Sequence, residues 1–252
     1  METLSLDPLF AWPLLFIVGA VTGAINTVAG GGSFLTLPVL IFLGLPAGVA
    51  NGTNRVGVLM QCAAGTWSFN RDGVLDRRAA LWASLPTCAG AIVGTLLAIY
   101  ISNDAFERVL AFLMLAITLL SFWTPRPVES PEDIDRARIG ILAVSFFGVG
   151  VYAGFVQAGV GFLILAATTF AGLDLVRGSA VKVLAVLACT VVSLGIFWWF
   201  GKVFWGVGIV LGLGSVLGAL VAARWAVRKG HGPLRVVVSV AVVVFAVLLW
   251  LR

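Results

Sequence analysis

Charged residues are scarce in this sequence. They make up 11% of its 252 residues, whereas soluble domains carry about 25%, and 61% of the residues are hydrophobic. So little polar surface excludes a soluble domain, and the long apolar runs predict an all-α polytopic membrane protein. The net charge of +5 does not indicate nucleic acid, because the basic residues fall in short loops between apolar runs. We therefore expect the lipid bilayer, and no nucleic acid, as a partner.

Histidine and cysteine are also rare. The only histidine, His231, lies in a basic loop, and the three cysteines lie inside apolar runs without a CxxC pair. This pattern argues against a structural metal site, and the cysteines are expected to be small buried apolar side chains. No serine, cysteine or carboxylate pair lies near a base in a way that indicates catalysis. We expect no cofactor and no enzymatic activity.

Long apolar runs are abundant. Charged or Gly/Pro-rich breaks delimit ten segments, at 9–29, 33–44, 46–69, 79–101, 105–123, 139–158, 162–172, 175–200, 206–226 and 234–251. The first follows an acidic N-terminus and is expected to be a retained membrane segment, not a cleaved signal peptide. The ten segments form two sets of five. The second segment of each set, 33–44 or 162–172, is too short to cross about 30 Å of hydrocarbon, since a helix rises 1.5 Å per residue. We predict full spans plus one broken or re-entrant short hairpin in each half.

The two sets of five segments align at an offset of 128 residues. Four glycine pairs share this frame: Gly31 with Gly159, Gly44 with Gly172, Gly73 with Gly201, and Gly90 with Gly218. Together with the repeated long-short-long order of segments, these pairs predict an internal duplication. The chain then divides into a first transmembrane repeat, a cytoplasmic linker loop and a second transmembrane repeat at 1–123, 124–138 and 139–252.

Lysine and arginine are unevenly distributed among the loops. If the loop 71–78 is cytoplasmic, alternation places eleven of them on the cytoplasmic side and three on the opposite side. This asymmetry predicts that both termini face outwards and that each copy crosses the membrane an odd number of times. The two copies would then be inverted relative to each other, as in many secondary transporters.

Two cations nonetheless lie inside apolar segments. Arg55 is in the segment 46–69 and Lys182 in 175–200, whereas the acidic residues all fall at segment ends or in loops. A charge near mid-membrane costs roughly 3 kcal/mol on insertion scales, so it marks a functional site by default. The alternative is snorkelling to the interface, which suits Lys182 better than Arg55, because Arg55 is far from both ends of its segment. Without a protein counter-charge, these residues predict an anionic ligand.

Neutral hydrogen-bonding residues accompany both cations in the sequence. The stretch Ala50–Arg55 reads Ala-Asn-Gly-Thr-Asn-Arg, and at the 128-residue offset Asn54 aligns with Lys182. In an inverted repeat, this alignment brings one cation from each copy towards the repeat interface. Arginine offers an oxyanion a planar fork, and lysine offers a compact charge. The neutral residues expected beside them are Asn51, Thr53, Asn54 and Ser179.

Three consecutive glycines, Gly30–Gly32, follow the first long segment. They should break the helix and expose backbone N–H groups, which membrane depth tolerates only beside protein or a watery cavity. Ser33 is placed to cap the short helix 33–44, whose N-terminus would attract an anion. Gln157 stands in the equivalent stretch of the second copy. Close helix packing, the alternative role of glycine, is favoured for two other pairs: Gly19 with Gly23, and Gly150 with Gly154.

Glycine-rich and polar motifs recur along both copies: Asn26, Gly30–Gly32, Pro38, Gly44, Ala50–Arg55 and Arg71–Val74 in the first, and Gly159, Gly161, Gly172, Lys182 and Gly201 in the second. In this combination the sequence resembles the sulfite exporter TauE/SafE family. The resemblance covers nearly the whole chain and is strongest over 19–78. It implies a multi-pass protein of the bacterial inner membrane with two similar halves, so that the outward termini would be periplasmic. Some members of the family are linked to export of sulfite, sulfoacetate or related sulfur-containing anions.

The residues and the resemblance together predict a transporter that exports a small anion by alternating access between two repeats. Sulfite or an organosulfonate such as sulfoacetate is the expected substrate. The expected substrate-binding residues are Arg55, Lys182, Asn54, Thr53, Asn26, Gln157, Gly30, Gly31, Gly32, Ser33, Asn51 and Ser179. A passive anion channel and a non-transporting membrane subunit are the alternatives. A homodimer is left open.

Overall fold

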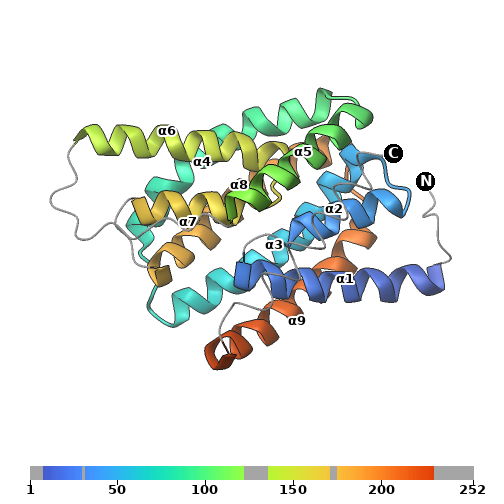
Figure 1. The fold of residues 1–252 in the computed structure, drawn as a ribbon, viewed down its shortest axis with the longest axis horizontal. Helices are drawn as coiled ribbons and strands as arrows, with labels where there is room; N and C mark the ends of the chain where they lie inside the picture. Colours follow the sequence, from blue (N-terminus) through green and yellow to red (C-terminus); the bar gives the residue numbers. More distant parts are fainter. Residues whose placement is uncertain (1–7, 30–31, 122–135, 171–174, 230–252) are drawn as a thin grey trace.

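The computed structural model describes residues 8–29, 32–121, 136–170 and 175–229, and within these ranges it is all-α. Figure 1 shows the helices gathered into one bundle with α3 running through its middle. The described helices are α1 (Pro8–Ala29), α2 (Ser33–Phe42), α3 (Ala47–Arg71), α4 (Arg77–Tyr100), α5 (Asn103–Ser121), α6 (Arg136–Phe155), α7 (Val160–Phe170), α8 (Leu175–Trp199) and α9 (Trp205–Lys229).

These helices confirm the first nine apolar segments, in order and within a few residues at most ends. The tenth segment, 234–251, lies outside the described residues, as does most of the expected linker 124–138. α2 has 10 residues and α7 has 11, so each is roughly 15 Å long and too short to span a bilayer. Three helical stretches in the described part are long and apolar enough to span one: Leu9–Thr27, Arg77–Tyr100 and Gly178–Trp199.

Helices from the two halves of the sequence pack against each other in a reciprocal way. α1 lies along α9, and α4 lies along α6, so the first helix of each half is paired with the fourth helix of the other. α3 packs against α8 and α9, and α8 packs against α4. The interface between the halves is therefore the interior of the bundle, and α3 and α8 are its central pair.

Glycines allow the paired helices to touch backbone to backbone. A Cβ added to Gly23 of α1 would overlap the carbonyl oxygen of Ser215 in α9, and one added to Gly154 of α6 would overlap that of Ala91 in α4. Gly19 and Gly150, one turn earlier, are equally close to the partner helix. The prediction that these two glycine pairs serve close helix packing is confirmed.

α3 and α8 run antiparallel. Gly52 in the first half of α3 faces Phe197 near the end of α8, whereas Gly65 near the end of α3 faces Val183 near the start of α8. The loop that follows α3 therefore lies at one end of this pair, and the loop that follows α8 lies at the other. Exposed tryptophans flank both loops, as interfacial aromatics do in membrane proteins: Trp67, Trp82, Trp198, Trp199 and Trp205.

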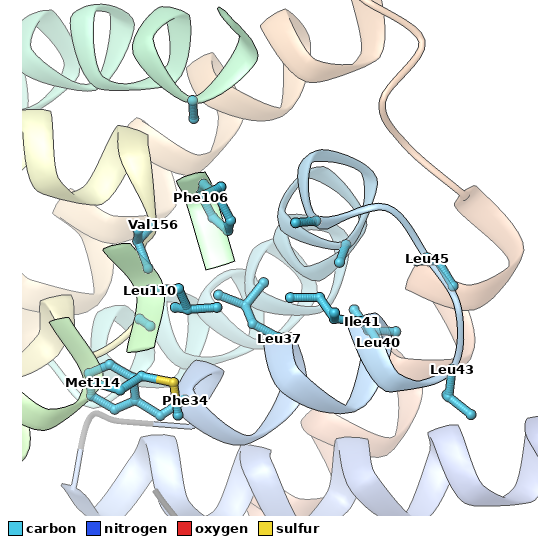
Figure 2. Packing of buried hydrophobic residues seen from close by; sticks show 14 of the residues in the cluster. Phe34, Leu37, Leu40, Ile41, Leu43, Leu45, Phe106, Leu110, Met114 and Val156 are labelled. Atoms are coloured by element: carbon cyan, nitrogen blue, oxygen red, sulfur yellow. The ribbon is translucent and has the colours of Figure 1, made fainter. Parts of the chain in front are cut away.

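One face of the short helix α2 is held by apolar packing. Its residues Phe34, Leu37 and Ile41 are buried in the same cluster as Phe106 and Leu110 of α5, as Figure 2 shows. The spacings of three and four residues put each set on one face of its helix. Elsewhere many large apolar side chains are exposed, such as those at the surface of α4, and in a bilayer they would contact lipid.

Candidate functional site

The N-terminal half of α3 is polar and almost completely buried. Asn51, Thr53 and Arg55 have no exposed surface, and Asn54 is 1% exposed. α2, α5, α8 and α9 all contact α3, so every face of this half is covered by protein. Buried polar groups need hydrogen-bond partners, and the partners of these side chains define two separate regions on different faces of α3.

The first region is a small polar pocket between α1, α2, α3 and α9. Its free volume is about 10 Å³, room for roughly one water molecule. Among the described residues, those that line it are all uncharged. They are Thr22, Asn26, Gly32, Ser33, Thr36, Asn54, Gly57, Val58, Gln61, Leu211 and Ser215.

Carboxamide side chains organise this polar pocket. Oδ1 of Asn54 accepts a hydrogen bond from Thr36 Oγ1 at 2.6 Å, and its Nδ2 donates to Ser33 Oγ at 3.2 Å. Nδ2 of Asn26 donates to Gln61 Oε1 at 3.0 Å, and Gln61 Nε2 donates in turn to the carbonyl of Gly23 at 3.1 Å. The pocket thus joins the end of α1, the start of α2 and the middle of α3 through neutral hydrogen bonds.

The expected role of Ser33 as a helix cap is wrong. Ser33 is the first residue of α2, and Gly32, which has no side chain to cap with, occupies the capping position in an α-helical conformation. The Ser33 hydroxyl instead accepts the hydrogen bond from Asn54. Gly30 and Gly31, which were expected to supply backbone donors here, lie outside the described residues.

The second region surrounds the guanidinium group of Arg55. Nη1 donates to the Ala153 carbonyl at 3.1 Å and to Gln157 Oε1 at 3.4 Å, and Nη2 donates to the Gly154 carbonyl at 2.5 Å. The ring of Phe197 lies 4.8 Å from the guanidinium carbon, a favourable cation–π arrangement. Within the described residues, Arg55 forms no ion pair with a carboxylate.

The carbonyls that bind Arg55 belong to the last turn of α6. A helix carries a partial negative charge at its C-terminus, which stabilises a nearby cation. Arg55 is therefore balanced in part by protein backbone, a source of negative charge that the expectation of an anionic ligand did not include. Asn51, one turn earlier on α3, donates to the Phe155 carbonyl at 2.7 Å and completes the contact.

Lys182 is not in contact with Arg55. Gly65, which faces Val183 beside Lys182, lies ten residues beyond Arg55, a separation of roughly 15 Å along α3. Lys182 and Ser179 are both partly buried and lie three residues apart on α8. The two cations thus lie along the same α3–α8 pair but at different levels, and they do not converge on a single point in this conformation.

The other expected residues are distributed as follows. Asn26, Gly32, Ser33 and Asn54 meet in the polar pocket, and Gln157 and Asn51 lie with Arg55 at the end of α6. Thr53 belongs to neither region, because its hydroxyl accepts a hydrogen bond from the Phe204 amide at 2.9 Å.

Several residues of both regions were missed at the sequence level. Thr22, Thr36, Gln61 and Ser215 complete the polar pocket, and Thr95, Thr190 and Ser193 form hydrogen bonds beside Arg55 and Gln157. The sequence did hold a signal for some of them. A polar residue inside an apolar segment needs a hydrogen-bond partner, and some of the missed residues share a helix face with a predicted site residue. Thr22 precedes Asn26 by four residues, and Gln61 follows Asn54 by seven.

An apolar helical bundle with a buried polar interior between its two halves is the architecture of a multi-pass membrane protein. A family model for the sulfite exporter TauE/SafE family matches residues 15–249, so the chain belongs to this family. The helices and this membership together make it a membrane transporter with a small-molecule substrate.

Curated relatives carry consistent names. The chain is 32% identical to a probable membrane transporter of Sinorhizobium sp., a match that covers 91% of this chain and 90% of the relative. It is 30% identical to one of Haemophilus influenzae, covering 90% and 89% of the two chains. It is 31% identical to one of Escherichia coli K12, covering 94% and 89%.

Proposed function

We propose that this protein exports a small anion, most simply sulfite or an organosulfonate such as sulfoacetate, across the bacterial inner membrane. The observation that carries the proposal is the fully buried Arg55, which has no carboxylate partner among the described residues. A cation held at this depth by carbonyls, a carboxamide and an aromatic ring can still bind an oxyanion, because backbone partial charges do not neutralise it. The name of the matching family, sulfite exporter, supports the substrate class.

The substrate route in this proposal passes the polar pocket and the Arg55 region. On one side of α3, neutral hydrogen bonds would come from Asn26, Gly32, Ser33 and Asn54. On the other side, the charge of the anion would be held by Arg55, Asn51 and Gln157. Lys182 and Ser179, at a different level of α8, would contact the anion at another stage of its passage, and Thr53, Gly30 and Gly31 stay candidates for the same route.

An inverted repeat is the proposed architecture, with the division at 1–123, 124–138 and 139–252. Two features support it. The pairing of α1 with α9 mirrors the pairing of α4 with α6, and the equivalent loops after α3 and α8 lie at opposite ends of that pair. Gly73 and Gly201, which align at the 128-residue offset, both adopt a positive φ in these loops, at 69° and 66°. Periplasmic termini and a homodimer stay predictions.

Alternating access is favoured over a passive channel by the size of the polar pocket. A pocket that holds roughly one water molecule is too small for a sulfur atom with three oxygens. The pocket must therefore widen before it binds such an anion. A pocket that is too small for the substrate in one conformation is expected of a carrier, whose two halves move against each other. An inside-negative potential favours anion exit by about 2.3 kcal/mol per charge per 100 mV, so no coupling ion is required.

Flux through proteoliposomes tests this function. We expect saturable flux of sulfite or sulfoacetate, faster efflux of labelled anion when unlabelled anion is present on the opposite side, and a fall in flux in both Arg55→Gln and Lys182→Gln. Equal flux in wild type and both variants would remove the proposed site. Neutral or cationic solutes that move better than anions would remove the substrate class, and flux without saturation or trans-stimulation would identify a channel.

Asn54→Leu tests the polar pocket separately. The substitution keeps the size of the side chain but removes the hydrogen bonds to Thr36 and Ser33, each worth about 1 kcal/mol or more when buried. We expect KM for the anion to rise roughly tenfold. Asn70→Leu, a matched change at the exposed end of the same helix, should leave KM unchanged. A folded Asn54→Leu protein with wild-type KM would exclude the pocket from the route.

A further inference from the structure

Three consecutive carbonyls at the end of α6 are held by side chains of α3. Arg55 binds those of Ala153 and Gly154, and Asn51 binds that of Phe155. The helix ends there, and four non-helical residues follow before α7 begins at Val160. Gln157 in this break accepts a hydrogen bond from Arg55 and donates one to Thr190 of α8. One helix of the first half thus fastens the interrupted helix pair α6–α7 of the second half.

This fastening leaves polar atoms unsatisfied. Nε of Arg55 and Oδ1 of Asn51 are buried and have no hydrogen-bond partner in the described part of the chain. Gln157 adopts a φ of 64°, a left-handed conformation that is uncommon for a residue other than glycine and that marks local strain. Unsatisfied buried groups and backbone strain persist only where the surrounding structure enforces them. The surrounding structure therefore enforces this conformation of the junction.

We propose that Asn51, Arg55 and Gln157 form a latch that keeps the α6–α7 break closed, and that an oxyanion opens it by competing with the α6 carbonyls for the guanidinium group of Arg55. This inference rests on the proposed function in taking the substrate to be an anion. In this latch Asn51 holds the end of α6, and Gln157 ties the break that follows it to Arg55 and to Thr190 of α8.

The geometry of the guanidinium group explains why an anion can win this competition. An oxyanion binds arginine best with two oxygens on two parallel N–H groups, such as Nε–H with the neighbouring Nη–H. Nε–H has no acceptor among the described residues, so one half of this fork is already available. The second half becomes available when Nη2 gives up a neutral carbonyl for a charged oxygen, which forms the stronger hydrogen bond. Thr95 Oγ1, 3.2 Å from the Gly154 carbonyl, remains to satisfy the oxygen that Arg55 leaves.

Hydrogen–deuterium exchange of the protein in lipid nanodiscs tests the latch. The probes are sulfite, sulfoacetate and sulfate, each compared with anion-free protein. We expect these anions to speed amide exchange at 153–160 about tenfold in the wild type while exchange in α1 and α9 stays the same. Unchanged exchange at 153–160 with all three anions would overturn the competition between anion and carbonyls.

Two variants weaken the latch in different ways. Arg55→Lys keeps the charge but loses Nε and the planar fork, and Asn51→Leu loses the bond to Phe155 without touching the charge. In both variants without anion, amide exchange at 153–160 should be about tenfold faster than in the anion-free wild type. Added anion should speed this exchange less than a further twofold. Ser84→Ala, which removes a buried hydroxyl of α4 bonded to Ala80, should behave as the wild type.

The anion-free comparison separates this inference from the transport proposal. The latch would be overturned if Asn51→Leu and any folded Arg55→Lys protein exchanged at 153–160 as slowly as the wild type. This would hold even if anion flux were normal. Conversely, fast anion-free exchange in these variants would support the latch even if proteoliposomes carried none of the tested anions. If Arg55→Lys does not fold, Asn51→Leu alone decides between the two results.

Discussion

Replacing Arg55 by glutamine is expected to reduce anion flux at least about 100-fold. The guanidinium group is completely buried and donates three hydrogen bonds, and glutamine carries no charge to attract an anion. Hydrogen bonds to a charged group are worth about 1.5–3 kcal/mol each, and each 1.36 kcal/mol is a factor of ten in rate. Loss of even two such contacts to the anion therefore accounts for a fall of this size. Initial rates of sulfite and sulfoacetate efflux from proteoliposomes measure it.

Arg71→Gln is the matched control. Arg71 lies at the other end of the same helix, its side chain is 65% exposed, and its ion pair with Asp72, at 3.6 Å, is a surface contact of little energetic value. Its flux should stay within about twofold of wild type. Size-exclusion chromatography and thermal unfolding must show that Arg55→Gln is folded. A folded Arg55→Gln protein with wild-type flux would mean that the charge serves assembly only, as in a non-transporting subunit.

Gly218→Val is expected to prevent correct packing of α9 against α1. A Cβ at this position would overlap the carbonyl oxygen of Ala20, and two rigid backbones cannot move apart without losing the contact along the whole helix pair. Overpacking usually costs about 1–3 kcal/mol, and a clash with backbone should reach at least the upper end of this range. We expect a large loss of folded protein after extraction and a marked fall in the thermal unfolding midpoint.

Gly195→Val controls for the change from glycine to a β-branched residue. Gly195 is also in a helix, α8, but apart from its chain neighbours and the backbone of its own helix, no atom of the described residues lies within 4 Å of a Cβ added there. Its yield and unfolding midpoint should match those of the wild type. Equal stability of the two valine variants would contradict the backbone contact between α1 and α9, and with it the reciprocal pairing of the two halves.

Much of the fold could be predicted from the sequence because the membrane constrains it strongly. A spanning segment needs about 20 apolar residues, so the breaks between apolar runs mark most helix ends within a few residues. The shortness of α2 and α7 follows from the same rule. The pairing of α1 with α9 and of α4 with α6 could not be predicted, since glycine spacing indicates that a helix packs closely but not against which partner.

The candidate site was predictable only in part. The sequence indicates which polar residues are buried, and Asn26, Ser33 and Asn54 do meet in one pocket. It does not indicate that Asn54 and Arg55 serve different regions, because neighbours on a helix point about 100° apart and only tertiary packing decides what each face meets. The partners of Arg55 at the end of α6 are backbone carbonyls, which leave no signal in the side-chain sequence.

Lys182 illustrates the limit of symmetry as an argument. At the 128-residue offset it aligns with Asn54, so the repeat predicts an equivalent position for it. Equivalent positions of an inverted repeat coincide only if they lie on the symmetry axis, and the contact between Gly65 and Val183, the neighbour of Lys182, lies roughly 15 Å from Arg55 along α3. The two cations therefore lie at different levels of the α3–α8 pair, and symmetry alone does not bring them to one point.

Equilibrium binding of radiolabelled sulfite to the purified protein in nanodiscs tests the central claim, recognition of a small anion through Arg55, most directly. We predict saturable binding that unlabelled sulfoacetate displaces and that neutral dimethyl sulfone does not. Arg55→Gln should lose this binding, and Arg71→Gln should retain it. Absence of saturable sulfite binding to the wild type, or displacement by dimethyl sulfone as effective as that by sulfoacetate, would contradict the claim.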